Sequence, residues 1–289
     1  MDWRVWLVAL AALTAGCNGF ALGASTPTAT PAPTPEPATP TPGPQQFAPG
    51  ITEFGIANAS AIAAAHRRAL RDRPYVWEEQ RESATASSDD PRRWNVVRTV
   101  TVENATRFHE RITRTLHREG GQSRLLREQS AFVASGTNYE QLNTYSDDPQ
   151  YWSHPTNQTG RQFVAESGRI VRRFLSVEQS NVTVVEDDGE RQYLVRGHNL
   201  DTDATYPVFN YRVRATISES GLVRSMTATF GVGNAGPTRE FRYHFEVRNV
   251  GSATVNEPLW VPTVRAQANA TGGEAGENAT DADEPPVGG

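Results

Sequence analysis

Six histidines are the side chains best suited to acid–base chemistry or metal binding near neutral pH. They are His66, His109, His117, His154, His198 and His244. None has a second His or Cys at a metal-ligand spacing, and His109-Glu110 begins no His-Glu-x-x-His motif because Thr113 occupies the fifth place. We therefore expect surface or hydrogen-bonded histidines. The sequence predicts no catalytic histidine, no bound metal and no cofactor.

The usual motifs of hydrolytic and phosphate chemistry are also missing. The chain has no Gly-x-Ser-x-Gly motif, no glycine-rich phosphate loop and no calcium loop. Asp-Asp pairs at 89–90, 147–148 and 187–188 stand beside turn residues, which favours solvated loops over a paired-carboxylate site. The sequence therefore predicts a protein that is not an enzyme. A hydrolase is the weaker alternative, because no nucleophile, base or metal set is visible.

The single cysteine, Cys17, has the most specific chemistry in the chain. It ends an apolar run, Val5–Gly16, which follows Arg4 and is too short for a bilayer span of roughly 20 residues. Thr14-Ala15-Gly16-Cys17 is similar to a prokaryotic lipobox, with the usual leucine one place early, at Leu13. We expect residues 1–17 to be a lipoprotein signal peptide and the Cys17 thiol to carry lipid. The alternative is an ordinary signal peptide with an incidental cysteine.

A lipid on Cys17 predicts a protein anchored to the cell membrane on its extracellular face. One acyl chain anchors only marginally, at about 0.8 kcal/mol per buried methylene, so durable attachment needs two chains or a second contact. Six Asn-x-Ser/Thr sequons fit exposure to a glycosylation system. The sites we expect to be modified first are Asn157, Asn269 and Asn278.

The charge pattern argues against nucleic acid as a partner. All 28 Lys+Arg residues are arginine, against 33 Asp+Glu, and the net charge is −5. Five acidic residues follow the last arginine, Arg265, so the rest of the chain is balanced and has no basic stripe. The expected partners are the membrane, through the anchor, and an apolar ligand or an envelope protein.

Composition divides the chain into four parts. After residues 1–17, a Thr/Pro-rich stretch at 18–50 predicts a disordered, extended tether. Residues 51–266 have the composition and length of a single globular α+β domain. Residues 267–289 are rich in Gly, Ala, Asn and acid, which predicts a disordered tail.

Two helices are expected in the domain. One starts at Asn58 or Ser60, runs through an alanine-rich stretch to about Arg71, and is stopped by Pro74. The second covers 161–175, where apolar residues recur at helical spacing. Gly168 weakens it by roughly 1 kcal/mol relative to alanine.

Most other segments alternate as strands do. Asp187-Asp188-Gly189 predicts a hairpin between 182–186 and 191–196. The clearest stretch, 207–249, predicts three neighbouring strands with one apolar face and one polar face. Phe209 and Tyr211 are expected on the apolar face. Since the two helices are available to cover that face, the fold class is α+β, a curved antiparallel sheet packed on helices.

Three arginines, Arg98, Arg114 and Arg224, fall where alternation predicts an apolar-face residue. One interpretation is a bulge or a sheet-rim arginine with a buried stem. The other is a cation at a cavity mouth that faces a ligand headgroup. Two interpretations also remain open for the tryptophans of the domain: they fill the core, or they line a ligand cavity. They are Trp77, Trp94, Trp152 and Trp260.

Several segments resemble an uncharacterised family of haloarchaeal lipoproteins. Besides the lipobox and tether, these are Ala61–Leu70 with Tyr75-Val76, Tyr211–Ser225 and Glu257–Pro262. More distantly, the layout looks like LolA-type lipoprotein carriers and mycobacterial lipid-carrying lipoproteins. That resemblance implies an unclosed half-barrel with helices on its concave apolar face and a hydrophobic cavity between them. A single-membrane archaeon has no outer membrane, so shuttling between membranes is not implied.

The resulting hypothesis is a surface-anchored, non-enzymatic protein that binds a lipid or another apolar ligand between sheet and helices. The alternative is a structural or interaction module of the cell envelope with no small-molecule ligand. The candidate cavity residues are Trp77, Trp94, Phe209, Tyr211, Phe241, Tyr243 and Phe245.

Overall fold

The computed structural model describes residues 43–85, 92–118, 123–187, 189–201, 208–233 and 238–268. All of them belong to one compact unit, Gly43–Gly289. The predicted signal peptide with Cys17, most of the tether, and the sequons at Asn269 and Asn278 lie outside the described residues. Asn157 lies exposed in a loop, where a glycan would find room. No helix among the described residues has the length and apolar character needed to cross a bilayer.

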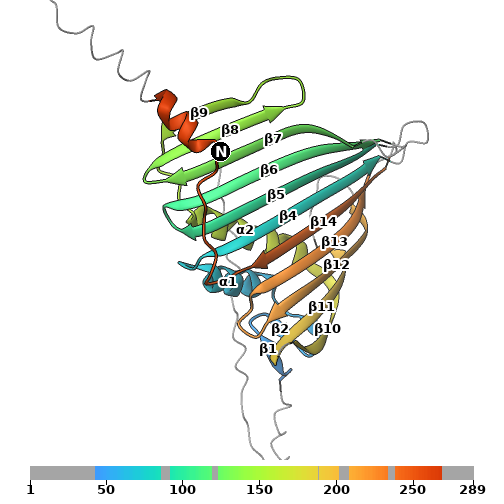
Figure 1. Cartoon of the computed structure of the whole chain (residues 1–289). Coiled ribbons are helices and arrows are strands. Elements are labelled where there is room, and N and C mark those ends of the chain that lie inside the picture. Colours follow the sequence, from blue (N-terminus) through green and yellow to red (C-terminus); the bar gives the residue numbers. More distant parts are fainter. Residues whose placement is uncertain are drawn as a thin grey trace, which may run out of the picture. The chain divides into compact units, whose positions relative to one another are not determined.

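A large curved sheet, open at both edges, dominates the described chain (Figure 1). Its eleven described strands follow the order β10-β11-β12-β13-β14-β4-β5-β6-β7-β8-β9, and every neighbouring pair is antiparallel. The first half of the chain supplies β4 Tyr75–Thr85, β5 Arg92–Asn104, β6 Arg107–Arg118, β7 Ser123–Ala134, β8 Thr137–Thr144 and β9 Gln150–Pro155. The second half supplies β10 Val177–Asp187, β11 Glu190–Leu200, β12 Val208–Ser218, β13 Val223–Val232 and β14 Arg239–Arg248.

The two halves are joined where β14 pairs with β4, which places Phe245 opposite Glu79 and Val247 opposite Trp77. The expected meander over 207–249 is confirmed as β12, β13 and β14. The expected hairpin at 187–189 joins β10 to β11. The predicted α+β class is thus confirmed, with two long helices on one face of a curved, unclosed sheet.

Both predicted helices are present. α1, Ala59–Leu70, begins after Asn58, whose side chain accepts a hydrogen bond from the backbone N–H of Ala61 at 3.0 Å. α2 covers Arg161–Leu175. The expected weakness at Gly168 has a structural purpose, because a Cβ there would lie 2.5 Å from Cγ of Arg67. Glycine therefore lets the two helices cross closely.

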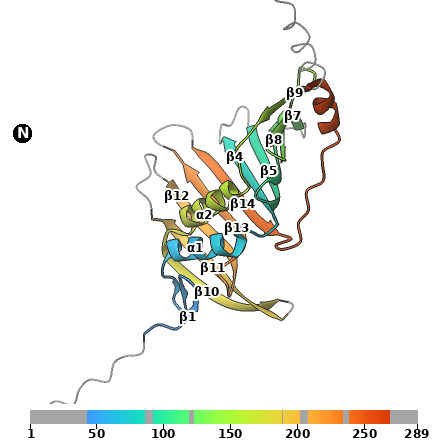
Figure 2. The ribbon, with the colours of Figure 1, turned by 90° about the vertical axis from the view of Figure 1, so that its left-hand side faces the viewer.

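α1 and α2 cover the concave face of the sheet from β10 to β4 (Figure 2). The core between them contains side chains from alternate positions of the strands, including Trp77, Val213, Ile217 and Phe245. His66 of α1 joins three elements inside this core. Its Nδ1 accepts a hydrogen bond from the backbone N–H of Val223 at 3.3 Å, and its Nε2 lies 3.2 Å from Ser167 Oγ of α2.

One face prediction is wrong. Phe209 was expected beside Tyr211 on the apolar face, but a bulge separates them, and Asn210 has a φ of 54°. Phe209 pairs with Gly231, and its ring occupies the space where a Cβ of Gly231 would be. Phe209 therefore lies on the convex face, and Tyr211 remains on the concave face.

The folded region starts earlier than the predicted end of the tether. Gln46–Ala48 form β1, which joins β2, Ile51–Thr52, and β3, Gly55–Ile56, in a small three-stranded sheet. The ring of Phe47 stacks on Tyr193 at 5.5 Å. This apolar contact orders a segment that composition alone assigned to the tether.

The C-terminal segment, residues 249–268, crosses to the convex face, where residues 261–268 form a short helix (Figures 1 and 2). There Val255 and Val261 pack on Phe132 of β7 in a second, small core. Val133, the next residue along β7, belongs to the main core on the concave face. The convex face of the sheet is therefore partly buried at β7, outside the meander over 207–249.

Candidate functional site

A cavity of about 510 Å³ lies between α2 and the concave face at β4, β13 and β14. We call it the α2 cavity. Its apolar lining combines α2 with two strands: Ile170, Phe174, Phe230, Val232, Phe241 and Tyr243. A volume of this size and a mainly apolar wall are typical of small-molecule sites, which occupy roughly 300–1,000 Å³.

Aromatic contacts shape the apolar end of the α2 cavity. Phe174 stacks on Tyr243 with ring centroids 4.3 Å apart, and Phe230 stacks on Phe241 at 5.3 Å. The hydroxyl of Tyr211 donates a hydrogen bond to the backbone oxygen of Phe174 at 2.5 Å, which ties the end of α2 to β12. This end of the cavity is therefore bordered by packed aromatic rings from α2, β13 and β14.

The other end of the α2 cavity is polar and includes Glu79 and Glu166, both of which pair with Arg98 of β5. Arg98 Nε donates to Glu110 Oε1 at 2.6 Å, and its two terminal nitrogens donate to the Glu166 carboxylate of α2 at 2.6 and 3.1 Å. The guanidinium also lies 4.8 Å from the centre of the Trp77 ring. Burial lowers the pKa of Arg98, but its hydrogen bonds to Glu166 and Glu110 outweigh this and raise its pKa above the ordinary value.

The geometry gives Arg98 a role outside both interpretations, because it pairs in register with Glu79 and Ile112 without a bulge. The residue does lie on the apolar face, as alternation predicted, but carboxylates of the protein already neutralise it. Arg98 therefore attaches α2 to the sheet. Arg224 is the extra residue of a bulge, since Thr216 pairs with Ser225 and Ile217 with Val223. Arg114 lies opposite Val96 and is exposed.

Two buried polar atoms of residues that line the α2 cavity have no hydrogen-bond partner among the described residues. They are Oε2 of Glu79 and the hydroxyl of Tyr243. Glu79 is 1% exposed, forms an ion pair with Arg81 through its other oxygen, and lies 3.9 Å from Arg98. Burial raises the pKa of Tyr243, so the hydroxyl stays protonated and can donate. Leaving such a group unsatisfied costs about 1–3 kcal/mol. Both atoms are covered by surrounding side chains, so neither is presented to the cavity.

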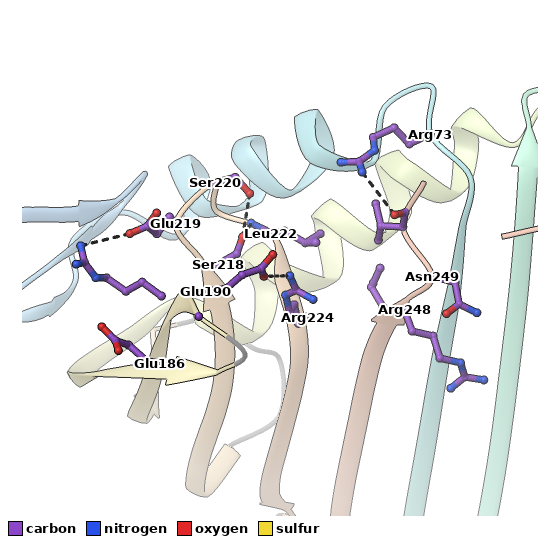
Figure 3. A pocket seen from close by; sticks show the side chains of 14 residues that line it. Arg73, Glu186, Glu190, Ser218, Glu219, Ser220, Leu222, Arg224, Arg248 and Asn249 are labelled. Atoms are coloured by element: carbon purple, nitrogen blue, oxygen red, sulfur yellow. Dashed lines mark hydrogen bonds and ion pairs between the residues drawn. The ribbon is translucent and has the colours of Figure 1, made fainter. Parts of the chain in front are cut away.

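A larger hollow, of about 680 Å³, lies where the β10–β11 hairpin meets the β12–β13 turn and the end of β14 (Figure 3). We call it the hairpin hollow. Two ion pairs join residues of its lining: Arg224 with Glu190 at 2.5 Å, and Arg191 with Glu219 at 3.3 Å. Arg248 pairs with Glu78 outside the hollow. Arg73 donates to the backbone oxygen of Val250 at 3.5 Å. Since its cations are satisfied by the protein and its lining is polar, the hairpin hollow is a weaker candidate despite its size.

The seven candidate cavity residues separate into three groups. Phe241 and Tyr243 line the α2 cavity. Trp77, Tyr211 and Phe245 are buried in the adjoining core. Trp94 is 42% exposed, and Phe209 lies on the convex face. Occupation of the cavity by a ligand stays a prediction.

Sequence reasoning missed the contribution of α2 to the cavity wall. Glu166, Arg169, Ile170, Arg173 and Phe174 follow the spacing i, i+3, i+4, i+7, i+8, so they form one stripe of the helix. That spacing was readable from the sequence. What it could not show was that the stripe faces a cavity and not a filled core.

The histidines take hydrogen-bonding roles. His66 is buried, and burial lowers its pKa to about 3, with a smaller contribution from Arg67. His109 lies 2.7 Å from Ser130 Oγ, and burial lowers its pKa as well. Among the described residues, no group of three or more His, Cys, Asp or Glu side chains is placed to hold a metal ion.

Comparisons with known proteins give no family assignment. No family model matches the chain, and no curated protein matches it. Distant structural neighbours include a DUF1329 family protein from Desulfovibrio piger, 9% identical over 70% of this chain and 94% of that chain, with a TM-score of 0.20. Another is a putative outer membrane lipoprotein-sorting protein domain from Vibrio parahaemolyticus, 10% identical over 73% and 99%, with a TM-score of 0.17. Scores this low carry no argument about function.

Proposed function

We propose that the protein is a non-enzymatic binding protein that holds an apolar ligand in the α2 cavity. The observation that carries this proposal is the apolar wall of a 510 Å³ space between α2 and the sheet. The ring stacks and the Tyr211–Phe174 hydrogen bond support it, because they fix the aromatic side chains of the wall against one another. The resemblance to lipid-carrying lipoproteins, noted from the sequence, favours a lipid as the ligand.

We further propose that a lipid on Cys17 holds the protein at the extracellular face of the membrane. The support is the lipobox-like Thr14–Cys17 and the apolar run before it. A Cys17→Ser variant is expected to leave the membrane fraction of the producing cells. Its retention there would remove the anchor proposal and leave the cavity proposal untouched.

The cavity proposal is tested with N-phenyl-1-naphthylamine, a neutral apolar dye that fluoresces when bound. The full chain carries Cys17→Ser throughout, so that no acyl group on that residue competes. Ile170→Trp fills the centre of the cavity and is expected to abolish dye binding. The matched control is Ala165→Trp, because Ala165 is an exposed residue of the same helix outside the cavity.

Circular dichroism and the unfolding midpoint verify that both variants stay folded. Equal dye binding by the two variants, or no binding by the parent chain, would contradict the proposal. The second of these results would favour the structural or interaction module as the function.

A further inference from the structure

We infer that the ligand of the α2 cavity carries an anionic headgroup, which Arg169 and Arg173 of α2 bind. This inference rests on the proposed function and specifies the ligand as a single-chain anionic amphiphile, with an alkyl chain and a carboxylate or phosphate head. The argument uses the charges around the cavity, the spacing on α2, and the direction in which the cavity changes from polar to apolar.

The charges around the cavity do not balance. Three arginines with side chains on the concave side line it, namely Arg81, Arg169 and Arg173, against two glutamates. Arg242 also borders the cavity, but it lies opposite Thr229 and alternates to the convex face. Both glutamates already have partners, because Glu79 pairs with Arg81 and Glu166 with Arg98. Arg169 and Arg173 are exposed, and neither forms an ion pair with a carboxylate of the described residues. The cavity therefore has positive charge that the described protein does not neutralise.

The spacing of these two arginines suits one small anion. Residues four apart lie on the same side of a helix, about 6 Å apart along its axis at 1.5 Å per residue. Ile170 lies between them and lines the cavity. A guanidinium pair at this separation can donate several charge-assisted hydrogen bonds to one carboxylate or phosphate. Arg173 also lies over the Phe174 ring at 5.8 Å, so its guanidinium is already directed toward the apolar wall.

The chain of the ligand would follow the apolar wall formed by Phe174, Phe230 and Val232. The hydroxyl of Tyr243 is covered by surrounding atoms, so the polar contacts of the headgroup come from α2. A neutral apolar ligand would leave the two arginines without an anionic partner. An anionic amphiphile satisfies the polar groups and fills the apolar space together.

The alternative is that these arginines only keep α2 soluble and complement its dipole. The helix provides its own control, because Arg161 and Arg172 are also exposed on α2 and do not line the cavity. Arg172 and Arg173 share the last turn, so a dipole effect would be equal for both. The comparison of R169Q/R173Q with R161Q/R172Q therefore separates the effect of arginines that line the cavity from the general effect of positive charge on α2.

The experiment measures displacement of N-phenyl-1-naphthylamine from the full chain by dodecyl phosphate, dodecanol and inorganic phosphate, below micelle-forming concentrations. We expect dodecyl phosphate to displace the dye at about tenfold lower concentration than dodecanol, a preference that two partly exposed charge contacts can supply. R169Q/R173Q should lose this preference while dodecanol displacement stays the same. R161Q/R172Q should keep it.

Three results would overturn the inference. Equal displacement by dodecanol and dodecyl phosphate would refute the anionic headgroup but leave the proposed function standing. An equal loss in R161Q/R172Q would show a general charge effect. Displacement by inorganic phosphate alone would indicate an anion site that needs no alkyl chain. If neither dodecyl compound displaces the dye, the proposed function fails too, so the two failures are distinguishable.

Discussion

Two parts of one antiparallel sheet bury opposite faces. The part under α1 and α2 buries its concave face, and the part under the C-terminal segment buries its convex face. In the first, helices and strands enclose a large core that includes Trp77, Phe163 and Phe245. In the second, the buried cluster consists of Phe132, Val255 and Val261. Strand β7 takes part in both, because alternate residues of a strand point to opposite faces. Either face of this sheet can be buried, depending on which segment lies against it.

The two parts of the sheet should differ in how much they contribute to stability. Hydrophobic stabilisation grows with the apolar area removed from water, so the helix-covered part should dominate the free energy of unfolding. The C-terminal segment relies more on hydrogen bonds, including Val255 N–H to Glu103 Oε2 at 2.9 Å and Arg107 to the Val255 oxygen at 3.0 Å. The α2 cavity lies in the helix-covered part.

The largest expected effect comes from Phe163→Ala. Phe163 is 1% exposed and contacts the Phe108 and Trp77 rings at centroid distances of 5.2 and 6.4 Å. Truncation should lower the free energy of unfolding by about 3–5 kcal/mol, measured by denaturant titration. A loss below about 1 kcal/mol would break the comparison, because the helix-covered part would then not be the stable centre.

Arg98→Met should have the next largest effect. It leaves Glu110 and Glu166 facing each other without their shared cation, which we expect to cost about 2 kcal/mol after allowance for partial exposure. The double variant Arg98→Met/Glu166→Met should recover part of that loss, because the uncompensated carboxylate of α2 is gone. Denaturant titration of both variants tests this. A double variant less stable than the single one would show that the ion pairs are not what attaches α2.

Val261→Ala tests the other half of the comparison. The lost side-chain carbons should lower stability by about 1.5 kcal/mol, at roughly 0.8 kcal/mol per buried methylene. Hydrogen exchange should accelerate in β7 and β8 while the amides of β12 to β14 stay protected, because the small core contacts only the first group. Faster exchange throughout the sheet would mean that the two cores unfold as one.

Near neutral pH the smallest effect is expected from His66→Gln, because this variant changes how the free energy of unfolding depends on pH. Burial holds the pKa of His66 near 3 in the folded chain against 6.5 for a free histidine, so the unfolded chain takes up the proton first as the pH falls. The contribution of His66 is complete above pH 6.5 and is lost as the pH falls toward 3. As the pH falls through this window, the free energy of unfolding of the wild type should therefore decrease by up to about 1.4 kcal/mol more per pH unit than that of His66→Gln.

The control for His66 is Ser167→Ala, which removes its hydrogen-bond partner on α2 but keeps the titrating ring. That variant should retain the steep slope when the free energy of unfolding is measured from pH 6 to 4. Identical slopes in wild type and His66→Gln would show that the ring is protonated in the folded state.

Local patterns were enough to predict α1, α2 and the meander over 207–249. Each depends on a period of 3.6 or 2 residues, on a cap such as Asn58, or on a turn such as 187–189, and these act between near neighbours in the chain. The general fold class followed, because an apolar sheet face must be covered and two amphipathic helices were at hand. Tyr243 and Phe241 were recognised for the same reason.

Only the tertiary structure decided which distant segments meet. Arg98 reaches Glu166 across 68 residues and Val255 reaches Glu103 across 152, and no local period encodes such contacts. The bulge at Asn210 depends on the chain's three-dimensional path and moved Phe209 to the convex face. The α2 cavity exists because the packing of α2 against β13 and β14 leaves space beside one stripe of the helix. A sequence pattern shows which residues share that stripe, but it does not show whether other side chains fill the space in front of them.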